Sequence, residues 1–340
     1  MTRLGINGFG RIGRCVLRAL EERKADGLFQ NLSVVAINEP APPESIEYLA
    51  RYDSTHGRFA GKVKVQDGHL QVNDKAIQLS HSQTTENLPW GTQEIDLLIE
   101  CSGSYSDRAT AQKHLDAGAK KLLFSQPAES DVDATIIYGL NHTELDTQHK
   151  IVSAGSCTTN SVLPPLKVLD DAIGIESVMI RTLHAAMNDQ PVIDAYHQGD
   201  LRRNRAAFES MIPVETQLAK GIGRIMPHLE NKTQASALRV PISDVSAMDI
   251  GVVLSADTEI EDIKALIKSA SESQFSGVLG YTSEPLVSCD FVHEPHSGIV
   301  DIQQLRMAGK RHVKLLVWFD NEWGYANRLL DIAEYWSRLS

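Results

Sequence analysis

A single cysteine stands among small and hydroxyl residues in the stretch 153–160, which reads Ser-Ala-Gly-Ser-Cys-Thr-Thr-Asn. An apolar, strand-like run precedes Cys157, and a helical pattern that ends near Ala172 follows it. At such a junction a thiol meets backbone N–H groups and the positive end of a helix dipole. Both favour the thiolate, so we expect a lowered thiol pKa and a nucleophilic Cys157. The alternative is a small buried side chain, which is common for a free cysteine.

The composition argues against several classes of protein. The chain has 340 residues, of which 42% are apolar, and this is enough for two domains with separate cores. The net charge of -11 argues against a nucleic-acid partner. No apolar run approaches the length of a membrane span, and the first residues lead into a strand pattern without a signal peptide. We therefore expect neither a nucleic-acid nor a membrane partner.

The four cysteines are widely scattered, and no Cys-x-x-Cys pair occurs. This spacing suggests neither a metal site nor a disulfide framework. We expect a protein of a reducing compartment, the cytoplasm.

A glycine-rich turn lies near the beginning of the chain. Residues 3–7 form a strand pattern, Gly8, Gly10 and Gly13 follow in Gly-x-Gly-x-x-Gly spacing, and a helical pattern comes next. In this context the glycines allow a tight turn and close approach to a pyrophosphate, which the helix N-terminus faces. We expect a dinucleotide-binding site, with a glycine-rich turn that binds no ligand as the alternative.

A second apolar strand pattern, residues 32–38, ends at Glu39. An acid at this place accepts hydrogen bonds from the adenosine ribose and repels a 2′-phosphate, so we expect NAD rather than NADP. Glu39 lies further from the glycines than the usual spacing. The polar stretch 21–31, which we expect to be a loop, accounts for the extra length. A solvated loop glutamate is the alternative.

The rest of the first half alternates between strand and helix patterns. Asp67-Gly68 predicts a hairpin within residues 61–79. Further strands are expected at 96–101, 121–125 and 134–138, and a helix at 107–117. This alternation predicts a doubly wound α/β domain with a parallel sheet. Cys157 then follows its last strand.

The second half shows a different pattern. A strand at 177–184 ends at His184, and a long polar segment, 188–204, follows it. Expected strands at 234–240, 249–254, 286–291 and 312–319 and helices at 260–271 and 325–339 complete the chain. We predict a mixed α+β domain that contains an antiparallel sheet. His184 is a candidate base, with a packing role as the alternative.

Several motifs, in this order, resemble the glyceraldehyde-3-phosphate dehydrogenase family from end to end. They are residues 6–14 (Ile-Asn-Gly-Phe-Gly-Arg-Ile-Gly-Arg), 52–57 (Tyr-Asp-Ser-Thr-His-Gly), 156–160 (Ser-Cys-Thr-Thr-Asn), 239–241 (Arg-Val-Pro) and 320–325 (Asp-Asn-Glu-Trp-Gly-Tyr). The resemblance implies a Rossmann domain, residues 1–156, completed by the C-terminal segment 320–340, and a catalytic domain, residues 157–319. It also implies NAD as cofactor and a homotetramer.

The resemblance also implies roles for individual residues. Cys157 matches the nucleophile and His184 the histidine that activates it. The implied cofactor-binding residues are Gly8, Gly10, Arg11, Ile12, Gly13, Glu39, Ser125 and Asn321. Those for the substrate and its phosphates are Ser156, Thr158, Arg203, Thr216, Gln217 and Arg239. The run 202–205 contains three arginines, so the choice of Arg203 stays open. The alternative for Arg203 and Arg239 is that they are surface charges.

The chain departs from the glycolytic members at three places. Met187 replaces a phosphate-facing threonine, Gln217 replaces a glycine, and Glu39 replaces an aspartate. The stretches 184–190 and 194–197 resemble the erythrose-4-phosphate dehydrogenase branch instead. That branch oxidises a sugar phosphate one carbon longer, releases the acid with water and serves pyridoxal phosphate synthesis. The alternatives are a phosphorylating glycolytic enzyme and a non-catalytic NAD-binding interaction protein.

Overall fold

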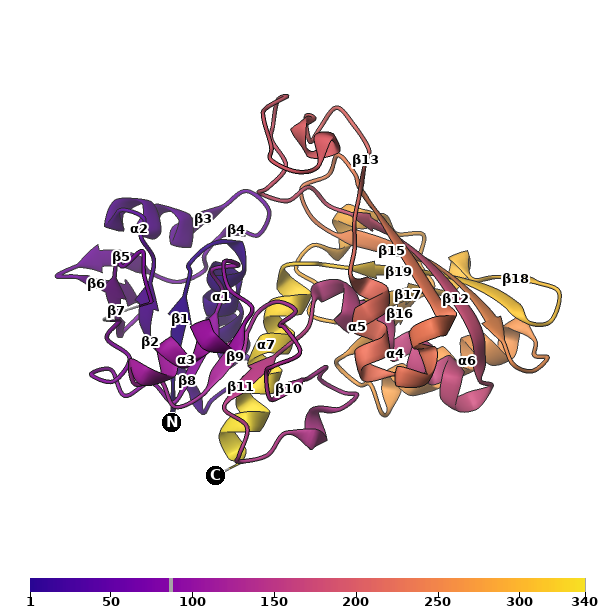
Figure 1. Ribbon diagram of the computed structural model, residues 1–340, viewed down its shortest axis with the longest axis horizontal. Helices are drawn as coiled ribbons and strands as arrows, with labels where there is room; N and C mark the ends of the chain where they lie inside the picture. Colours follow the sequence, from indigo (N-terminus) through magenta and orange to yellow (C-terminus); the bar gives the residue numbers. More distant parts are fainter. Residues whose placement is uncertain (86–87, 340) are drawn as a thin grey trace. The chain divides into compact units, whose positions relative to one another are not determined.

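The computed structural model describes residues 1–85 and 88–339, which form two compact units (Figure 1). The first unit is Met1–Ser156 together with Ala326–Ser340, and the second is Cys157–Tyr325. Among the described residues, no helix has both the length and the apolar character needed to cross a lipid bilayer.

Nine described strands form the sheet of the first unit. In spatial order they are β10 (Ala134–Thr135), β11 (Ile151–Ser153), β9 (Leu122–Phe124), β8 (Leu97–Glu100), β1 (Thr2–Asn7), β2 (Leu32–Asn38), β7 (Lys75–Ser80), β6 (His69–Val72) and β5 (Val63–Gln66). The strands from β10 to β7 are parallel, and β6 and β5 add the predicted antiparallel hairpin. The predicted doubly wound parallel sheet is confirmed.

The central strand β1 lies between β2 and β8. The chain fills one side of β1 first and then crosses to the other side, so the order of strands reverses there. Ligands of open parallel sheets bind beyond the carboxyl ends of strands at such a point. The ends of β1 and β8, at Asn7 and Glu100, are buried in the described structure.

The helices of the first unit are α1 (Arg11–Ala25), α2 (Pro43–Arg51), α3 (Arg108–Asp116) and most of α7 (Trp323–Arg338). The short strands β3 (Tyr52–Asp53) and β4 (Gly57–Arg58) pair with each other, and η1 (His142–Glu144) is a 3-10 turn. The expected loop at 21–31 is wrong in its first part, because α1 continues to Ala25. Glu21 lies on the polar face of α1 and pairs with Lys75 of β7 at 2.8 Å.

The second unit has a sheet of eight described strands. Seven lie in the order β13 (Ile212–Val214), β14 (Thr233–Arg239), β12 (Ile175–His184), β15 (Ser246–Leu254), β19 (His312–Phe319), β17 (Gly298–Asp301) and β16 (Leu279–Thr282), and β18 (Arg306–Ala308) pairs with β19. The pairs β12/β14 and β16/β17 are parallel, and the other pairs are antiparallel. The predicted mixed α+β class is confirmed, and the sheet contains both parallel and antiparallel pairs.

Three helices, α4 (Cys157–Ala172), α5 (Leu218–Ile225) and α6 (Ile260–Glu272), pack beside one another in the second unit (Figure 1). The central helix α4 contacts β12, β15, β17 and β19, so one face of the sheet forms the core. Along β12, Val178 and Ile180 are buried, whereas Met179 and Arg181, which point to the opposite face, are exposed.

The strand predicted at 286–291 is wrong, because this stretch contains the 3-10 turn η4 (Ser288–Phe291). The Asp290 carboxylate accepts a hydrogen bond from the Val287 backbone N–H at 2.8 Å and bends the chain. Phe291 then packs against Val245 and Ile299 in a small core cluster. The remaining 3-10 turns are η2 (Leu201–Asn204), η3 (Pro227–Lys232) and η5 (Ile302–Gln304).

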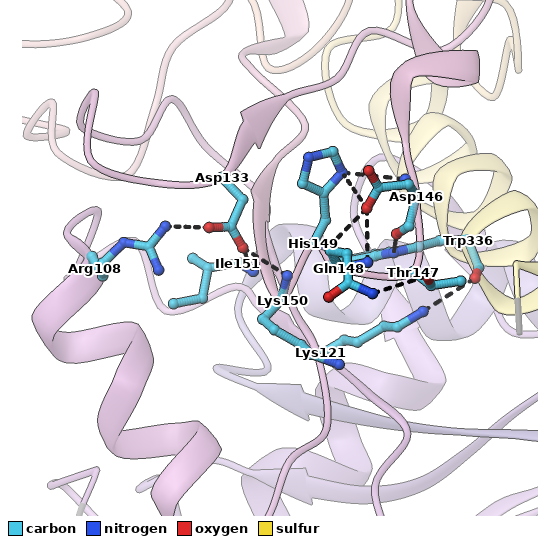
Figure 2. Close-up of polar contacts among 10 residues, drawn as sticks. All are labelled: Arg108, Lys121, Asp133, Asp146, Thr147, Gln148, His149, Lys150, Ile151 and Trp336. Atoms are coloured by element: carbon cyan, nitrogen blue, oxygen red, sulfur yellow. Dashed lines mark hydrogen bonds and ion pairs between the residues drawn. The ribbon is translucent and has the colours of Figure 1, made fainter.

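One carboxylate fixes the start of β11, the strand that leads to Cys157 (Figure 2). Asp133 Oδ2 accepts hydrogen bonds from the backbone N–H groups of Lys150 at 2.7 Å and Ile151 at 2.8 Å, and Oδ1 pairs with the Arg108 guanidinium. Burial raises the pKa of Asp133, but Lys150, Arg108 and Ile151 together outweigh burial and hold it below its ordinary value. The charged carboxylate therefore stabilises this part of the sheet.

We expect Asp133→Asn to lower the free energy of unfolding by about 1–3 kcal/mol at pH 7, because charge-assisted bonds are lost. A lowered folded pKa gives stability that is present above the unfolded pKa of about 3.9 and lost as pH falls through the folded value. The difference from the wild type should therefore narrow below about pH 4. Urea unfolding measures it, with Asp116→Asn, at an exposed site, as control. Equal stability of the wild type and Asp133→Asn at pH 7 would contradict this role.

Candidate active site

Cys157 is the first residue of α4 and follows β11 by a short turn. Gly155 in this turn has φ +65°, a left-handed conformation that glycine adopts without strain. The turn is further fixed by Ser153, whose hydroxyl donates to the Gln126 carbonyl at 2.7 Å and accepts from the Gly155 N–H at 3.0 Å. The strand-to-helix junction predicted for Cys157 is confirmed.

His184, the last residue of β12, lies against Cys157. The His184 Nε2 atom is 3.8 Å from the Cys157 Sγ atom, and Nδ1 is 2.9 Å from the Ala185 carbonyl oxygen. Because a carbonyl only accepts, Nδ1 carries the proton, which leaves Nε2 free to take one from the thiol. The ring also meets Phe319 of β19 edge-on, with centroids 6.3 Å apart.

The structure contradicts the lowered thiol pKa that we expected for Cys157. Burial raises the pKa of the Cys157 thiol to about 12, although the backbone N–H groups of Thr158 and Cys157 act in the opposite direction. Burial and the charge of Arg239 lower the pKa of His184, and its bond to Ala185 offsets this only in part. Both groups are therefore neutral near pH 7, as a thiol beside an imidazole. The prediction from the sequence took account of the helix N-terminus, but the burial of the Cys157 thiol could not be predicted from the sequence.

The glycine turn has the shape that a dinucleotide needs. Gly8 has φ +87°, and a Cβ there would lie 2.5 Å from the Ser102 backbone. A Cβ on Gly13 would lie 2.3 Å from the Gly8 carbonyl oxygen, so strand and helix could not pack. A Cβ on Gly10 would meet nothing within 4 Å, and Gly10, the N-cap residue of α1, has no side chain to cover the first turn. The turn thus leaves open space before a helix N-terminus, and this fits the pyrophosphate of NAD.

Glu39 lies beside this turn. Its Oε2 accepts a hydrogen bond from the Phe9 N–H at 2.8 Å, and its Oε1 accepts one from the Ala41 N–H at 3.2 Å. Glu39 lines a cavity of about 260 Å³ together with Gly8 and Gly10. Each carboxylate oxygen keeps capacity for a second hydrogen bond, which a ribose hydroxyl could donate.

The other site residues that we predicted in the first unit are Arg11, Ile12, Ser125 and Ser156. Arg11 is the first residue of α1, and its guanidinium pairs with Asp53 at 2.5 Å. Ile12 follows it in the first turn of the helix. Ser125 comes directly after β9, where it hydrogen-bonds the side chain of Cys101, whose pKa burial raises to about 12. Ser156 is the last residue of the first unit.

The structure brings Arg203 and Arg239 to one carboxylate. Asp189 Oδ1 is 2.8 Å from Arg239 Nη1, and Asp189 Oδ2 is 3.2 Å from Arg203 Nη1. Arg239 also donates to Gln190 Oε1 at 3.0 Å and lies 3.8 Å from Met187 Sδ. Arg239 is buried, so Asp189 and Gln190 fix the direction of its guanidinium. Two guanidiniums with one carboxylate keep a net positive charge.

Thr216 and Gln217 follow β13 and lead into α5. Thr216 Oγ1 accepts a hydrogen bond from the Leu218 N–H at 3.2 Å. Gln217 occupies the N-cap position of α5, where its side chain makes no capping hydrogen bond. Thr216 lines a cavity of about 420 Å³ with Arg202. The structure therefore groups Arg203 with Arg239 and groups Thr216 with Arg202.

Other polar residues of both units were missed by the sequence argument. Asn7 donates to Glu100 at 2.6 Å and accepts from Asn38 at 2.8 Å, which ties together the ends of β1, β8 and β2. In the second unit, Ser246 donates to Asn321 Oδ1 at 2.7 Å. The signal for Asn7 and Asn38 was visible, since a polar residue closes each apolar strand. Ser246 and Asp189 had no local signal, because their partners are distant in sequence.

The raised pKa of Cys157 makes a direct prediction for the cofactor-free protein. Below the pKa, the thiolate fraction grows about tenfold per pH unit, so alkylation of Cys157 by iodoacetamide should accelerate by about that factor per unit between pH 7 and 9. Peptide mass spectrometry measures the rate at Cys157, with Cys157→Ala as the control for its assignment. A rate that stays flat between pH 6 and 8 would instead indicate a thiolate–imidazolium pair.

Comparison with known protein families gives two matches along the chain. Residues 2–108 match the NAD binding domain of glyceraldehyde 3-phosphate dehydrogenase, and residues 156–321 match the C-terminal domain of the same enzyme family. The first match contains the glycine turn and Glu39, and the second contains Cys157, His184 and Asn321. The two matches follow the order of the domains and cover most of the sequence. The chain therefore belongs to the glyceraldehyde-3-phosphate dehydrogenase family of NAD-dependent dehydrogenases.

Proposed function

We propose that this protein oxidises D-erythrose 4-phosphate to 4-phosphoerythronate with NAD, through a thioester on Cys157 that water releases. The observation that carries the chemistry is the contact of 3.8 Å between the Cys157 thiol and the unprotonated Nε2 of His184. A nucleophile beside a base that a third group orients is the arrangement used in covalent catalysis. The reaction would serve pyridoxal phosphate synthesis.

The proposed steps use groups whose positions are described above. His184 Nε2 takes the thiol proton while Sγ forms a bond to the aldehyde carbon, and the resulting hemithioacetal keeps the aldehyde hydrogen. The Cys157 backbone N–H and the protonated His184 stabilise the oxyanion, and His184 Nε2 then returns the proton to it, so that the hemithioacetal carries a hydroxyl. Bound NAD would supply the acceptor for that hydrogen, which leaves as hydride. His184 takes the hydroxyl proton, a thioester forms, and water then cleaves the C–S bond to give the acid and the free thiol.

Several features near Arg239 support the longer substrate. Met187 places a thioether, which donates no hydrogen bond, 3.8 Å from Arg239 Nη2. A phosphate oxygen buried there would lack a hydroxyl donor, and an unpaired polar group is costly. We propose that the substrate phosphate lies away from Met187, held by Arg203, Thr216 and Arg239, and that the two arginines keep their ion pairs with Asp189. An aldehyde one carbon longer would reach Cys157 from this position. Ser156, Thr158, Thr216 and Gln217 complete the proposed substrate contacts.

We propose NAD as the physiological cofactor, held by the glycine turn, by the backbone of Arg11 and Ile12, and by Ser125 and Asn321. The position of Glu39 beside the turn supports NAD over NADP, because a carboxylate repels a 2′-phosphate. All four cysteines are free thiols, which suits a reducing compartment such as the cytoplasm.

We also propose a homotetramer. Among the described residues of the second unit, no helix packs on one face of its sheet, and this face exposes Met179 beside Arg181, Asp249 and Lys314. These side chains offer charges of both signs to a second copy.

The second candidate function is the phosphorylating oxidation of glyceraldehyde 3-phosphate, which the family match supports equally.

We expect Cys157→Ala to abolish aldehyde oxidation while NAD binding stays unchanged, because the thiol serves chemistry and the glycine turn serves binding. His184→Asn should slow hydride transfer by a factor of about 10²–10⁴, the usual cost of losing an acid–base group. Stopped-flow absorbance of NADH and titration of NAD binding measure both effects. Oxidation by Cys157→Ala above trace levels would rule out the nucleophile, and unchanged kinetics of His184→Asn would assign the histidine to packing.

The cofactor assignment predicts a higher kcat/KM with NAD than with NADP. Glu39→Gln removes the charge and keeps the shape, so it should narrow the preference by improving NADP turnover. Steady-state kinetics with both cofactors measure the ratio, and Glu44→Gln, an exposed glutamate at the start of α2, is the control. Equal kcat/KM values for NAD and NADP in the wild type would contradict a role for Glu39 in cofactor preference.

The substrate assignment predicts a higher kcat/KM for erythrose 4-phosphate than for glyceraldehyde 3-phosphate, without a requirement for inorganic phosphate. Oriented phosphate binding places the aldehyde at the thiol, so the wrong chain length should cost turnover as well as affinity. Met187→Thr restores a hydroxyl donor and should shift the preference toward the three-carbon substrate, whereas Met179→Thr on the sheet face should not. A wild-type preference for glyceraldehyde 3-phosphate that depends on phosphate would favour the glycolytic reaction instead.

A further inference from the structure

Ser246, the first residue of β15, is fully buried in the second unit. Its hydroxyl has two hydrogen bonds. The Ala185 backbone N–H donates to Ser246 Oγ at 3.0 Å, and Ser246 Oγ donates to Asn321 Oδ1 at 2.7 Å. One hydroxyl therefore joins the residue after His184 to the asparagine that we expect at the nicotinamide.

The chemistry of these partners fixes the direction of both bonds. A backbone N–H only donates, so the hydroxyl must accept from Ala185, and its own proton is left for Asn321. Asn321 must then present Oδ1 to Ser246 and keep its two amide N–H donors for another partner. With the amide reversed, the hydroxyl proton would be buried without an acceptor, which is costly.

The hydrogen bond from the Ala185 N–H to Ser246 affects the position of the His184 ring. Ala185 is held at its N–H by Ser246, and the next N–H, that of Ala186, donates to the Ile242 carbonyl at 2.9 Å. The Ala185 carbonyl between these two anchors accepts from His184 Nδ1 at 2.9 Å. A fixed carbonyl holds the proton on Nδ1 and so leaves Nε2 unprotonated toward Cys157.

We propose that Ser246 is a positioning residue that sets two things at once: the tautomer of His184 and the orientation of the Asn321 amide, whose N–H donors then face the carboxamide oxygen of a nicotinamide. This inference rests on the proposed function for the identity of the cofactor.

The test compares Ser246→Ala with Ser246→Thr, which keeps the hydroxyl, and with Ser297→Ala, which removes a buried hydroxyl elsewhere in the second unit. The readouts are the Kd for NAD and the rate of Cys157 alkylation by iodoacetamide at pH 8, neither of which needs turnover. We expect Ser246→Ala to weaken NAD binding and to slow alkylation by about 3–10-fold each, the effect of one lost buried hydrogen bond. Ser246→Thr should recover most of both losses, and Ser297→Ala should change neither.

A double-mutant cycle separates orientation from general loosening. In an Asn321→Ala background, Ser246→Ala should cause no further loss of NAD affinity, because the amide that it orients is gone. Additive losses, or losses in Ser246→Thr equal to those in Ser246→Ala while thermal melting shows both folded, would overturn the proposal. A wild type that binds NAD but oxidises no sugar phosphate would instead count against the proposed function and leave the binding cycle interpretable.

Discussion

The contact between the Cys157 thiol and the His184 imidazole is the interaction on which the proposed chemistry depends. Burial keeps both groups neutral, since it raises the pKa of the thiol and lowers that of the imidazole. A buried ion pair would cost desolvation energy without a substrate to use it. Proton transfer to Nε2 therefore becomes favourable only as the sulfur bonds to a carbonyl carbon. The bond from His184 Nδ1 to Ala185 keeps Nε2 ready for that step.

Regular structure supplies both partners of this contact. Cys157 begins a 16-residue helix, and His184 ends a 10-residue strand that pairs with β14 and β15. Register fixes His184 beside Arg239, because the two residues are partners in the parallel pair of β12 and β14. The base and the buried arginine therefore hold their places through backbone hydrogen bonds, which position side chains more tightly than a loop does.

The sequence was sufficient for the elements whose signals are local. The glycine spacing predicted the turn at Gly8, and the apolar runs predicted β1, β2 and β8, because each is buried on both faces of a parallel sheet. It failed at 286–291, where Asp290 turns an apolar run into a 3-10 turn, and at the short buried strands β16 and β17, which lack alternation.

The site residues divide in the same way, into those that have a local sequence signal and those that have none. Cys157 and His184 could be found from their positions at element ends. The thiol pKa could not be predicted, because burial is a property of the whole unit and outweighs the local N–H groups. Asp189 and Ser246 could not be found either, since their roles come from partners 14–75 residues away in the chain.

The most direct test of the central claim is to trap the covalent intermediate. The enzyme is mixed with NAD and erythrose 4-phosphate, quenched with acid within milliseconds, and analysed by intact and peptide mass spectrometry. The account predicts an adduct on the peptide that contains Cys157, with the mass of the aldehyde less two hydrogens, that forms with NADH and decays in water. NADH formation with no adduct on Cys157 at any time, or with an adduct on another residue, would contradict it.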